Sequence, residues 1–203
     1  MDTGSHFALE PHETALLAGG PRAAVTVAVV DLRLRGAVET GPGGTLCVLE
    51  PPEEELPPFT GTVLDCLDEP LTVRELVRHP DVRLALALTR IPLADAGLLG
   101  YPRLGANRAA RRRVEFLRER HPLPRGGHGL GDEDTLLAVA LHGEAALRVL
   151  LPRFARRAGL LSGPGADPED EVRPRRRGRF ARRAGTGGYE DAAGPRDRPG
   201  GRG

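Results

Sequence analysis

Two cysteines and six histidines are the residues of this chain whose types could support metal binding or nucleophilic catalysis. The cysteines are Cys47 and Cys66, and the histidines stand at positions 6, 12, 79, 121, 128 and 142. No CxxC or HExxH motif is present, and the histidines lack metal-ligand spacing. Both cysteines stand among apolar residues, so we expect buried, inert thiols, although a Cys–His pair distant in sequence stays open. The spacing therefore predicts no metal site and no cofactor.

The other residues that could act in catalysis are few. The sequence contains no lysine, which excludes a Walker A loop, a Schiff base and a pyridoxal-phosphate anchor. The two serines, Ser5 and Ser162, stand in or near segments that we expect to be loose, where a nucleophile is not held against a base. These absences predict that the protein is not an enzyme.

Arginines are the strongest candidates for contact with a partner. Three of them share one face of a helix expected over residues 107–120, where Glu115 and Glu119 are interleaved and internal ion pairs are an alternative role. The run RPRRRGRFARR at residues 173–183 could touch nucleic acid, an acidic protein or anionic lipid, or serve as a solubilising tail. The candidate binding residues are therefore Arg108, Arg111, Arg112, Arg175, Arg176, Arg177 and Arg179.

Two further features have simpler structural explanations than ligand binding. The run Asp132-Glu133-Asp134 could bind a cation, but three acids at a helix N-terminus also complement the helix dipole. The Gly19-Gly20 turn could hold a phosphate, but no strand precedes it and no second basic residue flanks Arg22. We expect a charged helix start and a plain interhelical turn.

A helix-like apolar stretch followed by a glycine and two apolar residues occurs three times. The copies cover residues 25–38, 84–99 and 147–161, and their glycines stand at positions 36, 97 and 159, which are 61 and 62 residues apart. A repeat of this size indicates one supersecondary unit used several times. Each glycine is expected to adopt the left-handed conformation that ends a helix.

The order of the expected elements divides the chain into four parts. Residues 11–50 contain helix, turn, helix and hairpin, which is the order of a winged helix, and residues 51–100 form a second such unit without an evident wing. Residues 101–161 form a C-terminal helical unit, and residues 162–203 form a disordered Arg/Gly/Pro-rich tail. The fold class is mainly α with a small β-hairpin, with tandem winged-helix-like units in one body. Expected helices cover residues 11–18, 21–35, 59–67, 72–78, 81–96 (kinked or split by Pro92), 107–120, 132–142 and 144–158.

A winged-helix order raises the question of DNA binding. A recognition helix must present polar side chains to base edges. The two candidate helices, residues 22–33 and residues 84–88, are apolar nearly all round and lack an Arg, Asn or Gln face at their start. We expect both to be core helices, so DNA binding is an alternative that the pattern does not favour.

Charge and composition give the body of the chain no polyanion-binding character. The net charge is +1, and residues 1–161 hold 19 Arg against 21 acids, whereas residues 162–203 hold 10 Arg against 7 acids. All 29 basic residues are Arg, which indicates a high-GC and hence bacterial genome. No signal peptide is visible, and the longest charge-free apolar run, residues 23–30, is shorter than the ~18 residues of a membrane span. We expect no transmembrane segment and a cytoplasmic location.

Three stretches resemble a known family. Residues 15–36 contain LLAGGP and a helix ending in RG, residues 84–99 end in AGLL before an Arg-rich stretch, and residues 138–160 contain VALHG-x-AAL-x4-P-x-FA-x3-GL. These motifs resemble actinobacterial proteins with an N-terminal LAGGP domain, whose members are often membrane-anchored, and this chain resembles a soluble member. The resemblance implies no established activity. In layout, residues 28–58 and the following TVRE stretch more weakly resemble the Golgi-phosphoprotein-like family, which implies binding of phosphoinositide headgroups.

The sequence therefore predicts a non-enzymatic protein-binding or scaffold protein whose partner is another protein. One alternative is a winged-helix DNA-binding transcriptional regulator. Another is a peripheral binder of anionic lipid of the phosphoinositide type.

Overall fold

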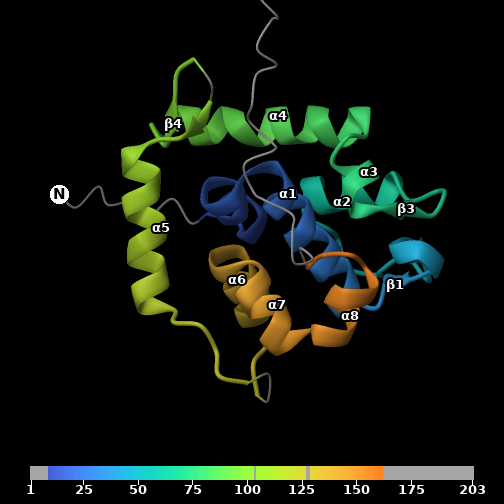
Figure 1. Cartoon of the computed structure of the whole chain (residues 1–203). Helices are drawn as coiled ribbons and strands as arrows, with labels where there is room; N and C mark the ends of the chain where they lie inside the picture. Colours follow the sequence, from blue (N-terminus) through green and yellow to red (C-terminus); the bar gives the residue numbers. More distant parts are fainter. Residues whose placement is uncertain (1–8, 103, 127–128, 162–203) are drawn as a thin grey trace, which may run out of the picture. The chain divides into compact units, whose positions relative to one another are not determined.

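The computed structural model describes residues 9–102, 104–126 and 129–161, which all belong to one compact unit. The expected disordered tail lies outside these described residues. Within them the protein is mainly helical with small antiparallel sheets, which confirms the expected helical class (Figure 1). In chain order the elements are α1 (Pro11–Leu34), β1 (Val38–Thr40), η1 (Pro42–Gly44), β2 (Thr45–Val48), α2 (Pro58–Asp65), β3 (Leu71–Thr72), α3 (Val73–Leu76), α4 (Pro80–Asp95), β4 (Leu99–Gly100), β5 (Gly105–Ala106), α5 (Arg108–Arg120), α6 (Asp132–His142), α7 (Glu144–Leu150) and α8 (Pro152–Arg157).

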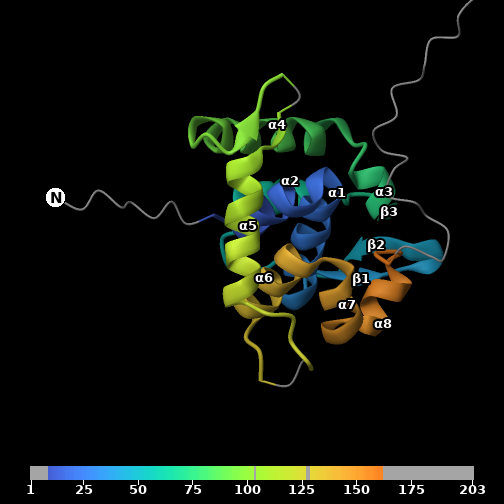
Figure 2. The same cartoon turned by 60° about the vertical axis from the view of Figure 1, so that its left-hand side comes forward.

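Helix α1 lies at the centre, and the other helices pack around it (Figures 1 and 2). A non-helical Gly20 (φ 77°, ψ −165°) divides it into two segments, as the Gly19-Gly20-Pro21 sequence predicts. The second segment is buried on all sides, with Val25, Val29 and Leu32 fully buried. The helices that pack most closely against α1 as a whole are α6 and α2. The expectation that residues 22–33 form a core helix is therefore confirmed.

The three repeated glycines end three helices in the same way. Gly36, Gly97 and Gly159 have φ values of 74°, 68° and 63°. After α1, the Ala37 N–H donates to the Leu32 carbonyl at 2.8 Å, and the residues after α4 and α8 make the corresponding bonds at 2.9 Å. This pattern is the Schellman motif, in which the left-handed residue lets the chain reverse and satisfies carbonyls at the helix end. The local part of the repeat prediction is confirmed.

Two small sheets accompany the helices. The expected hairpin forms between β1 and β2, with Val38 opposite Val48, and β3 adds a third antiparallel strand through the pair Leu46 and Leu71. A second hairpin, β4–β5, follows α4 with Leu99 opposite Ala106. The sequence did not indicate this hairpin, because its strands are only two residues long.

Prolines have different effects in two helices. The helix expected over residues 144–158 is divided into α7 and α8, because Leu151 takes a non-helical conformation (φ −133°, ψ 48°) immediately before Pro152. The expectation of one continuous helix there is wrong. Helix α4, in contrast, continues through Pro92 without being split.

Candidate functional site

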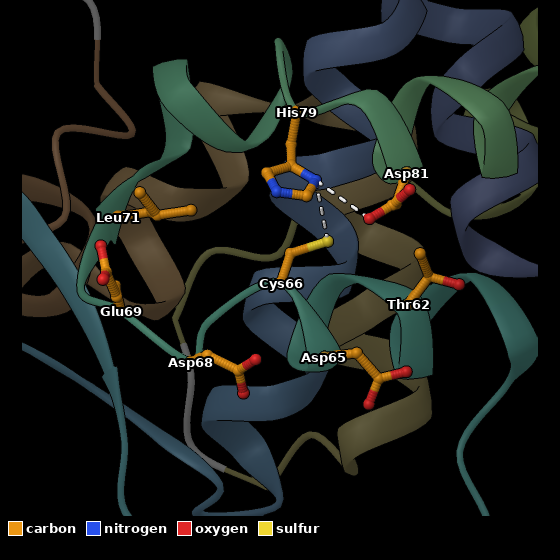
Figure 3. A pocket seen from close by; sticks show the side chains of 8 residues that line it. All are labelled: Thr62, Asp65, Cys66, Asp68, Glu69, Leu71, His79 and Asp81. Atoms are coloured by element: carbon orange, nitrogen blue, oxygen red, sulfur yellow. Dashed lines mark hydrogen bonds and ion pairs between the residues drawn. The ribbon is translucent and has the colours of Figure 1, made fainter.

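A pocket of about 600 Å³ lies where α2 ends and α4 begins (Figure 3). Three side chains with metal-ligating or nucleophilic atoms meet there. Cys66 is the C-cap residue of α2, His79 is the N-cap residue of α4, and Asp81 lies in the first turn of α4. The pocket is therefore built from the two ends of a short connection that folds back on itself.

Local sequence explains how this connection folds. After the Asp68-Glu69-Pro70 turn, Thr72 and Glu75 form the expected capping box that starts α3. The Thr72 backbone N–H donates to Glu75 Oε2 at 2.9 Å, and the Glu75 N–H donates to Thr72 Oγ1 at 3.3 Å. Helix α3 is short, and Pro80 in the first turn of α4 suits the start of a helix directly after His79.

Cys66 and Asp81 both approach the same ring nitrogen of His79. Cys66 Sγ lies 3.2 Å from His79 Nδ1, and Asp81 Oδ2 lies 3.7 Å from the same Nδ1. All three candidate ligand atoms lie within 4.8 Å of one another. In Figure 3 the Cys66 sulfur and the Asp81 carboxylate both point toward the His79 ring.

The pocket has an acidic rim. Its lining residues include four carboxylates and, within the described part of the chain, no arginine; they are Thr62, Asp65, Cys66, Asp68, Glu69, Leu71, His79 and Asp81. Burial raises the pKa of the Cys66 thiol, and the nearby carboxylates of Asp81, Asp65 and Asp68 raise it further. The Val82 backbone N–H, which donates to Cys66, has the opposite and smaller effect on this pKa. The electrostatic field of the pocket favours a cation over a free thiolate.

The geometry differs from that of a catalytic triad. In a triad the histidine uses one ring nitrogen for the nucleophile and the other for the orienting acid. Here Cys66 and Asp81 both approach Nδ1 of His79, and the raised thiol pKa disfavours the reactive thiolate. A sulfur, a nitrogen and an oxygen atom that lie within 4.8 Å of one another are instead compatible with a metal-ligand set.

Sequence reasoning missed this cluster. It treated Cys66 as an inert thiol and found no ligand spacing among the histidines. Cys66 is indeed buried, but its sulfur faces His79 and the pocket. The available signal was the His79-Pro80-Asp81 sequence, which places a histidine and a carboxylate on either side of a helix-starting proline, downstream of a cysteine.

The outer face of α4 is a second candidate site. Leu84, Leu88 and Ile91 are 60%, 56% and 56% exposed, whereas Leu86 and Leu93 on the opposite side are buried. The expectation that residues 84–88 form a core helix is therefore wrong. The reason is position: α4 lies at the edge of the molecule, with the neighbouring helices on one side only (Figures 1 and 2).

The predicted arginine contacts are only partly described. Arg108, Arg111 and Arg112 are exposed on α5, and within the described residues none of them forms an ion pair with Glu115 or Glu119. The tail residues Arg175, Arg176, Arg177 and Arg179 lie outside the described residues. A further basic cluster not predicted from the sequence lines a hollow of about 370 Å³ on α8: Arg153, Arg156 and Arg157.

The acidic run and the central helix also bear on earlier expectations. Asp132, Glu133 and Asp134 occupy the first turn of α6, as expected for dipole complementarity.

By length and composition α1 could cross a membrane, with a mean hydropathy of 1.5, but 67% of the relevant window is buried inside the molecule. Such burial is usual for the core helix of a globular protein.

Comparison of the chain with models of protein families, with curated proteins and with solved structures gives no match in any of the three. The chemistry and placement of the residues described above are therefore the basis on which a function can be proposed.

Proposed function

We propose that this protein is a non-enzymatic protein-binding or scaffold protein, and that the outer face of α4 is its docking surface. The observation that carries the proposal is an exposed apolar series at helical spacing. It consists of Leu84, Ala87, Leu88, Ile91 and Ala94. An apolar stripe of this kind, with large side chains more than half exposed, is typical of a surface that packs against a partner helix.

The fold itself does not need this stripe. Val82, Leu86 and Leu93 anchor the inner side of α4 to the body, and all three are buried. Full burial of an aliphatic side chain contributes about 1.5–3 kcal/mol relative to leaving it exposed. The half-exposed leucines and isoleucine therefore retain a substantial part of that free energy for a partner.

The edge of the stripe indicates what the partner carries. Arg83 and Arg90 lie seven residues apart, so they border the same side of the stripe. Neither forms an ion pair among the described residues. The complementary occupant is an amphipathic helix of another protein, with acidic residues along one edge of its apolar face.

Other occupants fit the stripe less well. Residues 162–203 contain no apolar series at helical spacing. In a symmetrical antiparallel pair of α4 helices, the edge with Arg83 and Arg90 would face the same edge of the second copy. Like charges oppose that pairing.

The proposed tandem winged-helix architecture supports the same role. In the second unit, α2, α3 and α4 precede the β4–β5 hairpin, which extends past the expected end of the unit at residue 100, so α4 takes the place of a recognition helix. Its exposed face is apolar rather than polar, which suits a protein surface better than base edges. The cytoplasmic location and the two family resemblances stay predictions.

The test uses a displayed library of amphipathic helical peptides whose apolar faces are bordered by acidic, neutral or basic residues. We expect the protein to select acidic-edged peptides and the R83E/R90E variant to select basic-edged ones. Leu88→Glu should weaken binding at least about tenfold, because a charge in the centre of an apolar contact is not compensated. Arg125→Glu, at an exposed arginine between α5 and α6, is the matched surface control and should leave binding unchanged.

Three results would contradict the proposal. They are selection of the same peptides by the wild type and R83E/R90E, full binding by Leu88→Glu, and loss of binding in Arg125→Glu. If duplex DNA bound through Arg108, Arg111 and Arg112 instead, the DNA alternative would replace it. Binding to anionic vesicles that depends on Arg153, Arg156 and Arg157 would favour the lipid alternative.

A further inference from the structure

We propose that the pocket between α2 and α4 binds a zinc-type divalent cation, with Cys66, His79 and Asp81 as its protein ligands. The docking face starts at Leu84, three residues after Asp81, but none of the residues that line this described pocket belongs to that face. The proposal rests on three observations: the spacing of the donor atoms, their chemical types and the charge of the pocket.

The spacing of the donor atoms suits a single metal ion. Zinc bonds of about 2.3 Å to sulfur and about 2.0–2.1 Å to nitrogen or oxygen, at a tetrahedral angle, place ligand atoms about 3.3–3.6 Å apart. The separations are 3.2 Å between Cys66 Sγ and His79 Nδ1 and 3.7 Å between His79 Nδ1 and Asp81 Oδ2. Cys66 Sγ and Asp81 Oδ2 lie within 4.8 Å of each other, so these two atoms would have to approach each other when an ion binds.

The donor types select the kind of metal. Thiolate sulfur and imidazole nitrogen suit zinc and its neighbours among the divalent transition metals, whereas magnesium and calcium prefer sets of oxygen atoms only. One sulfur, one nitrogen and one oxygen are therefore the signature of a borderline-soft cation. Iron, cobalt, nickel and copper compete for the same ligands, and geometry and availability decide among them.

The surroundings of the three ligands favour a positive ion. Asp65, Asp68 and Glu69 add negative charge to the rim, and no arginine lines the described pocket. The Val82 N–H already donates to Cys66, which is the kind of outer contact that stabilises a metal-bound thiolate. On binding, the Cys66 S–H bond breaks, the sulfur–metal bond forms with the sulfur electron pair, and one proton leaves to solvent.

The fourth coordination position is open to solvent. In Figure 3 the Asp65 and Asp68 carboxylates lie beyond Cys66 as seen from the His79 ring, so water is the expected fourth ligand. The three ligands belong to the end of α2 and the start of α4. Metal binding should therefore hold these two helices together and raise the thermal stability of the protein.

The experiment titrates the reduced, metal-free full chain with Co²⁺ and follows its absorption, and then displaces Co²⁺ with Zn²⁺. We expect a thiolate-to-cobalt charge-transfer band at one equivalent, loss of the band when zinc is added, and a rise in Tm with either metal. Cys66→Ser should abolish the band. His79→Gln and Asp81→Asn, at partly or largely exposed side chains, should each weaken metal affinity at least about tenfold while the fold is retained.

Cys47→Ser is the matched control, because Cys47 is the other free thiol of the chain and lies in β2, outside the pocket. It should bind cobalt and zinc as the wild type does. The proposal is overturned if the wild type shows no thiolate-to-cobalt band, if Cys66→Ser keeps the band, or if Cys47→Ser loses it. It is also overturned if His79→Gln and Asp81→Asn, folded by circular dichroism, bind both metals with unchanged affinity.

Discussion

His12 shows how burial changes the chemistry of a single side chain. Its ring stacks on Phe59 in the core, with ring centroids 5.0 Å apart and an interplanar angle of 19°. Desolvation by burial lowers the pKa of His12 from 6.5 to about 4, although the charge of Asp31 acts in the opposite direction. The folded protein therefore holds this histidine in its neutral form at physiological pH.

This pKa predicts a loss of stability at mildly acidic pH. Between pH 6.5 and about 4 the unfolded chain binds more protons at His12 than the folded chain does, so the free energy of unfolding falls as pH falls. The shift corresponds to about 3 kcal/mol of unfolding free energy. Urea unfolding of the wild type and of His12→Leu across this pH range measures the effect.

The comparison between the two proteins isolates His12. Glu13 has a raised pKa because of burial, so it acts in the opposite direction, but it is present in both proteins. We expect the pH dependence of His12→Leu to be shallower than that of the wild type. Equal slopes for both proteins would show that His12 is not buried as a neutral ring.

Helix ends are the feature that the sequence specifies best at the level of elements. The Schellman motifs after α1, α4 and α8 depend on contacts within six residues, and a glycine followed by apolar residues is a local signal for them. Position 36 shows the requirement clearly. Its φ is 74°, and an added Cβ would meet no atom within 4 Å, so only backbone conformation disfavours a side chain there.

Gly36→Ala is therefore expected to lower the free energy of unfolding by about 1–2 kcal/mol, which is the cost of a left-handed conformation for an L-residue. Gly61→Ala is the matched control, because Gly61 lies within α2 and its added Cβ would meet only Leu56 Cβ, at 4.0 Å. Alanine should raise stability there by about 0.5–1 kcal/mol. Urea titrations of both variants measure the change in the free energy of unfolding, which should be negative for Gly36→Ala and positive for Gly61→Ala. Stabilisation by Gly36→Ala would contradict the assigned helix end.

Local and non-local features differ in how well the sequence predicts them. The helices, the β1–β2 hairpin and the three glycine stops were predictable because caps, turns and periodicity act over a few residues. The Cys66–His79–Asp81 cluster was not, because it requires α3 to turn the chain back between the ends of α2 and α4. The exposure of Leu84 and Leu88 was not predictable either, since apolar residues occur on both sides of the middle of α4 and the pattern does not say which side the body covers.

At the scale of the whole described unit, α4 connects the two sites. Its N-terminal turn supplies His79 and Asp81 to the acidic pocket, and its middle presents the apolar stripe at the edge of the molecule. The central α1 and its partners form the core, to which Cys66 of the pocket belongs, whereas the exposed residues Leu84, Leu88 and Ile91 of the stripe do not. The arrangement suits a rigid body in which α4 binds a partner, and in which the proposed metal ion would link the start of α4 to the end of α2.

The most direct test of the docking proposal is photo-crosslinking in cells of the source organism, with a photoreactive residue in place of Leu88. We expect one discrete adduct with another protein, whose crosslinked peptide, identified by mass spectrometry, is an amphipathic helix with acidic residues beside its apolar face. The adduct should disappear when Leu84→Glu and Ile91→Glu are added, and a photoreactive residue in place of the exposed Arg125 should not form it. An adduct with a second copy of this chain, or the same adduct from position 125, would contradict the account.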